Sequence, residues 1–156
     1  MSQSLDRETQ TKAATVDPRG PRFAAAVTAA VLAAVLILSG SPLGFVLLLG
    51  QTAVFALGAL RGPQRTPYAA AFRRFVRPRL GPPVELEDVR PLRFAQSVGL
   101  FFGLLGLLGF LLAPVVGLVA VGAAFVAAFL NAAFGYCLGC EMYLILRRIQ
   151  PASTSN

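Results

Sequence analysis

Two long stretches without a charged residue constrain this 156-residue chain more than any other feature. The first covers residues 23–60 and is interrupted only by the turn-forming sequence at 39–42. The second covers residues 94–140 and is broken by proline and glycine at 113–117. Because a membrane-spanning helix needs about 17 to 25 mostly apolar residues, each stretch is long enough for two spans joined by a short turn.

The composition supports a membrane protein. Hydrophobic residues make up 56% of the chain and charged residues only 13%, whereas soluble domains carry about 25% charged residues. We therefore predict an all-α polytopic membrane protein with four transmembrane helices near 23–39, 44–60, 94–112 and 117–146. The last interval is too long for one straight span, so we expect tilt, a break near 135–139 or a short interfacial extension.

These spans divide the chain into five segments. We predict a disordered cytoplasmic N-terminal tail at 1–22, a first transmembrane hairpin at 23–60, a basic cytoplasmic loop with an interfacial helix at 61–93, a second transmembrane hairpin with a CxxC motif at 94–148, and a C-terminal tail at 149–156. A cleaved signal peptide over residues 23–41 is the alternative for the first span, because this stretch is rich in alanine and ends in small residues.

The basic residues lie on one side of the predicted spans. The chain has 14 Lys and Arg against 7 Asp and Glu, and the loop at 61–93 alone holds eight arginines against three acids, while the turns at 39–44 and 113–117 hold no charge. The positive-inside rule then places both termini and this loop in the cytoplasm, with the protein in the inner (plasma) membrane. A nucleic-acid-binding patch is the alternative explanation for the charge, but four spans account for it, so we expect no nucleic acid partner.

Part of the basic loop has the pattern of an interfacial helix. Thr66 followed by Pro67 predicts a helix start, apolar residues recur at helical spacing over 68–76, and Pro78 ends the pattern. Away from the apolar stripe lie three arginines that we expect at the lipid interface: Arg73, Arg74 and Arg77. Each basic residue near anionic lipid contributes about 1 kcal/mol to membrane binding, so the bilayer is the partner of this segment.

Two segments of the chain repeat one another. Residues 17–27 align with 88–98 at a constant offset of 71, with Asp, Arg, Arg, Phe, Ala and Val identical in six of the eleven positions. Each copy precedes a hairpin and enters the membrane from the same predicted side, which indicates a parallel internal duplication. The alternative is that cytoplasmic entrances to helices commonly collect Arg, Pro and Phe.

The composition also excludes most familiar catalytic sites. The chain has no His, which removes Ser-His-Asp and Cys-His nucleophile pairs and His-ligated metals. Two cysteines cannot complete a four-thiolate zinc or iron–sulfur site within one chain. We therefore expect no metal site and no bound cofactor.

The residues best suited to chemistry are Cys137, Cys140 and Glu141. On a continuous helix they fall within an arc of roughly 100° and share one face. With Arg147 at the interface, Cys140 would lie roughly 10 Å and Cys137 roughly 15 Å inside the membrane. Helical spacing exceeds what a disulfide prefers, so an intramolecular bond would need a local rearrangement that Gly135 and Gly139 permit.

Each of these residues has a simpler explanation. The cysteines are also suitable packing residues at a helix crossing, where Gly135 and Gly139 form a close-packing pattern. A carboxylate within a span is functional by default, but Glu141 could also pair with an arginine at 147–148. Three amides are candidates for a polar interior or pore, although hydrogen bonds between helices explain them equally well: Asn131, Gln51 and Gln96.

The segment 131–143, Asn-Ala-Ala-Phe-Gly-Tyr-Cys-Leu-Gly-Cys-Glu-Met-Tyr, and the repeated Asp-x-Arg-x-x-Arg-Phe pattern resemble a known bacterial family. This family is the integral-membrane "domain of unknown function 4395", and the resemblance runs from about residue 16 to 148. It implies a four-helix membrane protein without an established activity, encoded near thioredoxin-like and sulfurtransferase proteins. The resemblance carries over only to Cys137, Cys140 and Glu141.

Our leading hypothesis is a membrane thiol-redox or sulfur-relay protein whose cytoplasm-facing CxxC exchanges electrons or sulfur with a thioredoxin-like or sulfurtransferase partner. Cys140, nearer the surface, would react first with the partner, and Cys137 would resolve the intermediate. Thiol–disulfide or sulfur-transfer chemistry would make the protein an enzyme. The alternatives are a small transport subunit for a sulfur species or a proton, and a non-catalytic membrane assembly protein.

Overall fold

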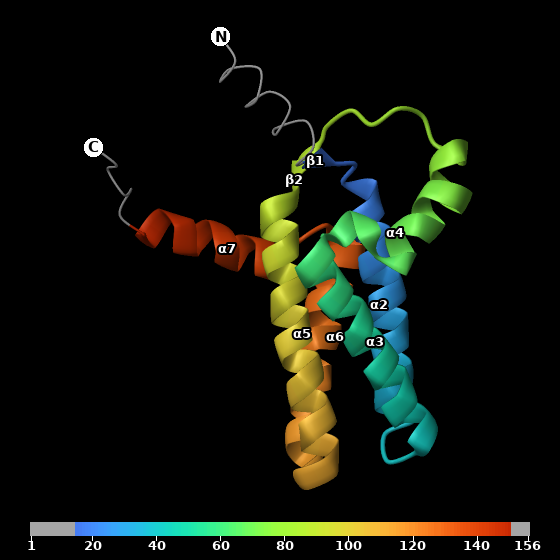
Figure 1. The fold of residues 1–156 in the computed structure, drawn as a ribbon, viewed down its shortest axis with the longest axis vertical. Helices are drawn as coiled ribbons and strands as arrows, with labels where there is room; N and C mark the ends of the chain where they lie inside the picture. Colours follow the sequence, from blue (N-terminus) through green and yellow to red (C-terminus); the bar gives the residue numbers. More distant parts are fainter. Residues whose placement is uncertain (1–14, 151–156) are drawn as a thin grey trace.

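The computed structural model describes residues 15–150. Four helices in this range are long and apolar enough to cross a membrane: α2 (Arg19–Ile37), α3 (Pro42–Arg61), α5 (Val89–Leu112) and α6 (Pro114–Phe134). They form an all-α bundle in which α3 packs on α5 and α2 packs on α6 (Figure 1). The predicted all-α polytopic membrane fold is confirmed. Most of the predicted tails at 1–22 and 149–156 lies outside the described residues, but the prediction of a disordered tail is wrong for residues 15–22, which contain β1 and the first turn of α2.

Short elements cluster at one end of the bundle. They are β1 (Thr15–Val16), η1 (Pro63–Arg65), α4 (Pro67–Ala71), η2 (Phe72–Val76), η3 (Arg77–Arg79), β2 (Glu87–Asp88) and α7 (Leu138–Ile149). The uncharged segments form most of each spanning helix, and every charged residue in the described part of the chain lies at this same end, either in the terminal turns of the spanning helices or beyond them. We call it the charged end. It is the upper end in Figure 1.

The helix predicted within the basic loop is present as α4, η2 and η3 in succession, and its position at the lipid interface stays a prediction. Thr66 is its N-cap, with its side-chain oxygen accepting a hydrogen bond from the Ala69 N–H at 3.2 Å, and Pro67 occupies the first helical position. Such a cap satisfies one of the N–H groups that a helix start leaves free. The helix widens into a π turn over 72–76 and ends in a 3₁₀ turn that contains Pro78.

The last predicted span is divided into two helices. α6 stops at Phe134, where Gly135 adopts a left-handed conformation (φ 68°), and α7 begins at Leu138. A left-handed glycine is a common way to end a helix, because it lets the chain turn while the last carbonyls are still satisfied. α7 then runs across the charged end at a steep angle to the bundle (Figure 1). A break near 135–139 was therefore the correct option for absorbing the excess length.

The two hairpins run in the same sense. α2 and α5 both start at the charged end, and α3 and α6 both return to it (Figure 1). The two repeated entrances have the same local structure, since Asp17 accepts from the Arg19 N–H at 3.0 Å and Asp88 accepts from the Arg90 N–H at 2.9 Å. Each aspartate also pairs with the arginine's guanidinium at 2.8 Å. The common direction of the hairpins and the matching contacts at their entrances agree with the predicted parallel duplication.

The strand pair links the two copies at equivalent positions. β1 and β2 are antiparallel, and Val16 lies opposite Glu87, its own equivalent under the constant offset of the repeat. When two copies of a segment pair around a two-fold axis, one residue must face its own equivalent at that axis. This strand pair therefore places the pseudo-two-fold axis through the centre of the charged end, along the bundle.

The structure extends the repeat beyond the hairpins to α4 and α7. Phe23 packs on Phe72 with ring centroids 5.9 Å apart, and Phe94 packs on Tyr143 at 5.8 Å. Both members of the second pair follow those of the first at the same constant offset. α7 is therefore the counterpart of the α4–η2 segment, a relation that the aligned segments 17–27 and 88–98 do not reveal.

Two equivalent arginines cap helices of the opposite copy. Arg22 donates to the Ala132 carbonyl near the end of α6 at 3.4 Å. Its equivalent, Arg93, donates to the Ala59 and Leu60 carbonyls near the end of α3 at distances from 3.1 to 3.3 Å. Basic side chains stabilise helix C-termini in this way, so these arginines join the two copies at the charged end.

The apolar core lies in the half of the bundle away from the charged end. Leu32, Val35, Leu48 and Val121 form this core. Gly103 of α5 allows close packing beside this core, since a Cβ at this position would lie 2.6 Å from the Thr52 hydroxyl oxygen. Small residues at such crossings let membrane helices approach one another.

Candidate functional site

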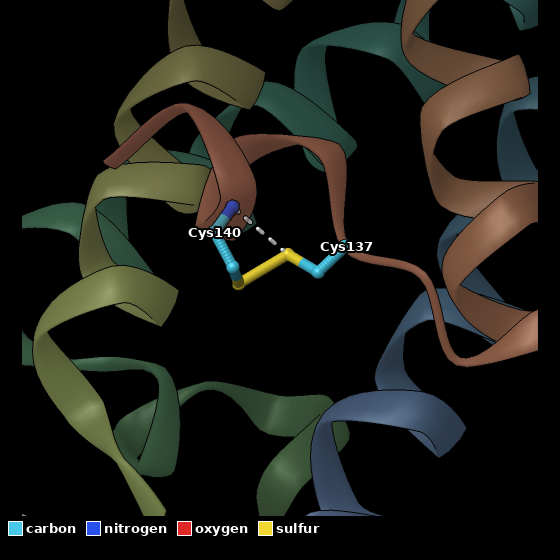
Figure 2. Close-up of a disulfide and its surroundings, with 2 residues drawn as sticks. All are labelled: Cys137 and Cys140. Atoms are coloured by element: carbon cyan, nitrogen blue, oxygen red, sulfur yellow. Dashed lines mark hydrogen bonds between the residues drawn. A yellow bond between two sulfur atoms is a disulfide. The ribbon is translucent and has the colours of Figure 1, made fainter. Parts of the chain in front are cut away.

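Cys137 and Cys140 form a disulfide at the start of α7, with their Cα atoms 5.2 Å apart (Figure 2). The expectation that both cysteines and Glu141 share one face of a continuous helix was wrong. Cys137 has extended backbone and lies outside α7, because the chain turns at Gly135. The predicted depths of roughly 10 and 15 Å along one straight span fail for the same reason.

Cys137 is the N-cap residue of α7. Its sulfur accepts a hydrogen bond from the Cys140 N–H at 3.3 Å (Figure 2), and its carbonyl accepts from the Glu141 N–H at 3.0 Å. The equivalent position in the first copy is Thr66, whose hydroxyl caps α4 in the same way. The helix start therefore holds the sulfur of Cys137 against the backbone N–H of Cys140.

Glu141 lies in the first turn of α7 and is partly exposed. It belongs to none of the four spanning helices, so the premise of a carboxylate within a span does not hold. Among the salt bridges of residues 15–150, none involves Glu141, so the alternative of an ion pair with Arg147 or Arg148 is not present in this range. A negative charge in the first turn is stabilised by the helix dipole.

A cavity of about 680 Å³ lies beside the disulfide at the charged end. Its walls come from the adjoining halves of the four spanning helices, at 20–28, 54–55, 92–102 and 123–131, and from α4, η2 and the start of α7. The segment at the start of α7 contributes Cys137, Leu138, Gly139 and Met142. The disulfide is thus built into the wall of a mainly apolar chamber on the pseudo-two-fold axis.

Two of the three predicted interior amides line this cavity with Cys137, namely Gln96 and Asn131. Within residues 15–150 the side-chain amide of Asn131 makes no hydrogen bond. The Oε1 atom of Gln96 is buried and has no hydrogen-bond partner within residues 15–150. It lies close to Gly58, because a Cβ added to Gly58 would be 2.7 Å from this oxygen. The cavity therefore has amide groups in its wall that no other side chain satisfies.

The third amide, Gln51, has a structural role. It is 2% exposed, accepts a 2.6 Å hydrogen bond from the Tyr68 hydroxyl, and donates to the Thr28 hydroxyl at 3.5 Å. These bonds tie α4 to α3 and α2. Burial raises the pKa of Tyr68, so this hydroxyl stays a donor at neutral pH. In the sequence Tyr68 belongs only to an apolar stripe, because nothing in its spacing indicates a partner on another helix.

The three predicted interfacial arginines differ in their surroundings. Arg73 donates to the Gln64 carbonyl at 2.6 Å and, together with Arg77, lines the cavity. Arg74 instead lies over the ring of Phe75, 5.4 Å from its centroid. Two of the arginines therefore belong to the rim of the cavity.

Comparison with known proteins identifies a family. The sequence profile described as a domain of unknown function (DUF4395) matches residues 16–148. No curated protein matches the chain, and no solved structure does.

Proposed function

The chain belongs to the DUF4395 family, and we propose that it is a membrane thiol–disulfide exchange protein whose reactive pair is Cys137 and Cys140. The observation that carries this proposal is the position of the pair. A disulfide joins the N-cap residue of α7 to the first turn of that helix, at the charged end and in the wall of a cavity.

The cap makes Cys137 the better leaving group. When the disulfide opens, a Cys137 thiolate keeps the N–H of Cys140 as a donor and lies at the positive end of the α7 dipole. A disulfide is attacked fastest at the sulfur whose partner leaves most easily. An incoming thiolate is therefore directed to Cys140. This is the same sulfur that was expected from the sequence to meet the partner, although for a different reason.

The exchange has two steps. A thiolate of the partner bonds to the Cys140 sulfur, the Cys137–Cys140 bond breaks, and its electron pair leaves on Cys137. A second thiolate of the partner then attacks the partner's own sulfur in the mixed disulfide and releases Cys140 as a thiolate. The partner has been oxidised to a disulfide, and two electrons have passed to the cysteine pair.

We place the charged end in the cytoplasm of the inner membrane, with a dithiol protein of the thioredoxin-like class as the partner. The support is the one-sided distribution of arginines, which the positive-inside rule assigns to the cytoplasm. Disulfides that face the cytosol are usually transient and catalytic, which agrees with exchange rather than a structural bond. A sulfurtransferase partner would instead leave a persulfide on Cys140.

The packing of the bundle favours exchange over transport. The cavity ends at the core of Leu32, Val35, Leu48 and Val121. A second cavity of about 410 Å³ lies beyond this core, between the two turns at the opposite end. In the described residues the core thus separates the two cavities, and a transport path would have to open through it.

The test uses the purified protein in detergent micelles with reduced thioredoxin as the dithiol probe. We expect the wild type to oxidise one thioredoxin per molecule, counted as two thiols lost from thioredoxin and two gained by the membrane protein. Cys137→Ser should not complete this cycle. Thr66→Ser, altered at the equivalent position of the first copy, is the matched control and should react as the wild type does. A wild-type disulfide that thioredoxin leaves intact would overturn the proposal.

A further inference from the structure

We infer that the cavity beside Cys137 binds a lipid-soluble quinone, which takes two electrons from the reduced cysteine pair and restores the disulfide. This inference rests on the proposed thiol exchange and adds its electron acceptor. A cytosol-facing dithiol is kept reduced by soluble thiol systems, so regenerating its disulfide needs an oxidant outside those systems. The bilayer around the four spanning helices is a source of such an oxidant.

The cavity has the size and lining that a quinone head group requires. Its volume of about 680 Å³ falls in the range of about 300 to 1,000 Å³ that is typical of small-molecule sites. More than half of the lining residues are Ala, Gly, Val, Leu or Phe, and most of these belong to the spanning helices. An apolar ring is stable in such a chamber, whereas a hydrophilic oxidant would lose its hydration there.

The polar groups in the wall match the two redox states of a quinone. The side-chain amide of Asn131 provides an N–H donor for a quinone carbonyl and a carbonyl acceptor for a hydroxyl of the hydroquinone. The Asn131 amide makes no hydrogen bond within residues 15–150. A bound head group would therefore satisfy an amide that the fold leaves open.

Cys137 is the cysteine that lines the cavity, and Cys140 is not among the wall residues. This division gives each sulfur one role. The Cys137 thiolate bonds to a ring carbon of the quinone, and the Cys140 thiolate then attacks the Cys137 sulfur. The sulfur–carbon bond breaks, its electron pair stays on the ring, and two protons complete the hydroquinone. Two electrons and two protons leave the dithiol, and one disulfide forms.

The reaction is measurable with a fully substituted benzoquinone carrying a decyl chain, and with 2,3-dimethyl-1,4-naphthoquinone as a second ring type. Protein reduced with dithiothreitol and desalted should convert one quinone to hydroquinone per molecule, followed by absorbance, while losing two thiols. Full ring substitution limits irreversible arylation of the cysteines.

Two variants test the cavity itself. Ala127→Phe places a ring into the wall of α6 and should slow quinone reduction by at least about tenfold. Ala133→Phe adds the same ring at a position of α6 outside the cavity and should leave the rate unchanged. Asn131→Leu should raise the quinone KM by about tenfold with little change in kcat. Leucine already occupies the equivalent position of the first copy, at Leu60.

Exchange with thioredoxin, measured on the same samples, separates the two proposals and shows that each variant is folded. Normal thioredoxin exchange with no quinone reduction by the wild type would overturn the quinone inference and leave the proposed function standing. The quinone inference would also be overturned if the Ala127→Phe variant reduced quinone as fast as the Ala133→Phe variant. A phospholipid retained at one per molecule by native mass spectrometry, which excess quinone does not displace, would show that the cavity is a lipid site instead. If neither thioredoxin nor quinone reacts, both proposals fail.

Discussion

The two copies of the repeat build the same helix start with different chemistry. In the first copy the hydroxyl of Thr66 caps α4 by accepting from the N–H of Ala69. In the second copy the sulfur of Cys137 caps α7 by accepting from the N–H of Cys140. The comparison shows that a cap needs only an acceptor, and that two residue differences at a structural cap separate a threonine cap from a disulfide-bonded cap. The first copy therefore serves as an internal control for the second.

The strongest test makes the second copy resemble the first. The double variant Cys137→Thr with Cys140→Ala replaces the pair by the residues found at 66 and 69. We expect thiol exchange with thioredoxin to be lost completely, because no sulfur remains. The helix content measured by circular dichroism should stay unchanged, because threonine also caps a helix. Unfolding of this variant would show that the disulfide is needed for the fold.

The reverse exchange tests whether the two sites have the same geometry. Thr66→Cys with Ala69→Cys, made in the double variant above, should form a disulfide at the start of α4 when oxidised. The measurement is the loss of two maleimide-reactive thiols and a mass lower by two hydrogens. Two thiols that stay reactive after oxidation would show that the backbone at 66–69 differs from that at 137–140.

A smaller effect is expected at Glu141, whose equivalent in the first copy is Ala70. Glu141 directly follows Cys140 and is partly exposed in the first turn of α7. We propose that its carboxylate accepts the proton of the partner's thiol, which then attacks Cys140 as a thiolate. Glu141→Gln should then slow exchange with thioredoxin by about tenfold or more, within the usual range for proton transfer by a side chain, without changing thermal stability. An unchanged exchange rate would show that Glu141 takes no part in proton transfer and has only a favourable interaction with the helix dipole.

The smallest effect concerns the two aspartates that begin the copies. Hydrogen bonds from the Arg19 side chain lower the pKa of Asp17 below its ordinary value of 3.8, and those from Arg90 do the same for Asp88. A lowered pKa stabilises the fold above the ordinary value, and this stability is lost as the pH falls through the lowered pKa. Asp17→Asn keeps a capping side chain and removes the charge, so it should lower stability at pH 7 by about 1 kcal/mol.

The difference between Asp17→Asn and the wild type should shrink as the pH is lowered below 3.8. Asp88→Asn should have a smaller effect, because the Asp88 side chain is 42% exposed and that of Asp17 is 8% exposed. Urea denaturation in mixed micelles at several pH values measures both. A penalty that does not depend on pH would contradict the assigned ion pairs.

The sequence predicted the spans well and the geometry of the cysteine pair less well, for a physical reason. Uncharged length defines a membrane helix, so α2, α3 and α5 lie close to their predicted ranges. The end of α6 depends on one backbone conformation at Gly135, and apolar residues continue on both sides of it. Hydropathy therefore does not indicate the turn. Because the turn was not predicted, the expectation that Cys137 and Cys140 lie on one face of a continuous helix was wrong.

The sequence predicted the duplication of the hairpins but not the equivalence of α4 and α7. Residues 17–27 and 88–98 share enough identical residues to be aligned, whereas α4 and α7 have diverged almost completely. Their equivalence is shown by the packing of Phe23 on Phe72 and of Phe94 on Tyr143, and by the matching N-caps at Thr66 and Cys137. The cavity between the copies is a property of all the helices together, and no local pattern encodes it.

Trapping the partner in cells tests the central claim most directly. Cys137→Ser, Cys140→Ser and the wild type would be produced in their native membrane, quenched with acid, alkylated, and compared on non-reducing gels. We predict a mixed disulfide that accumulates with Cys137→Ser through Cys140 and disappears on reduction, with none for Cys140→Ser. If neither variant forms a mixed disulfide or a persulfide, and both support full function in cells, the cysteine pair is a packing element and the exchange mechanism is wrong.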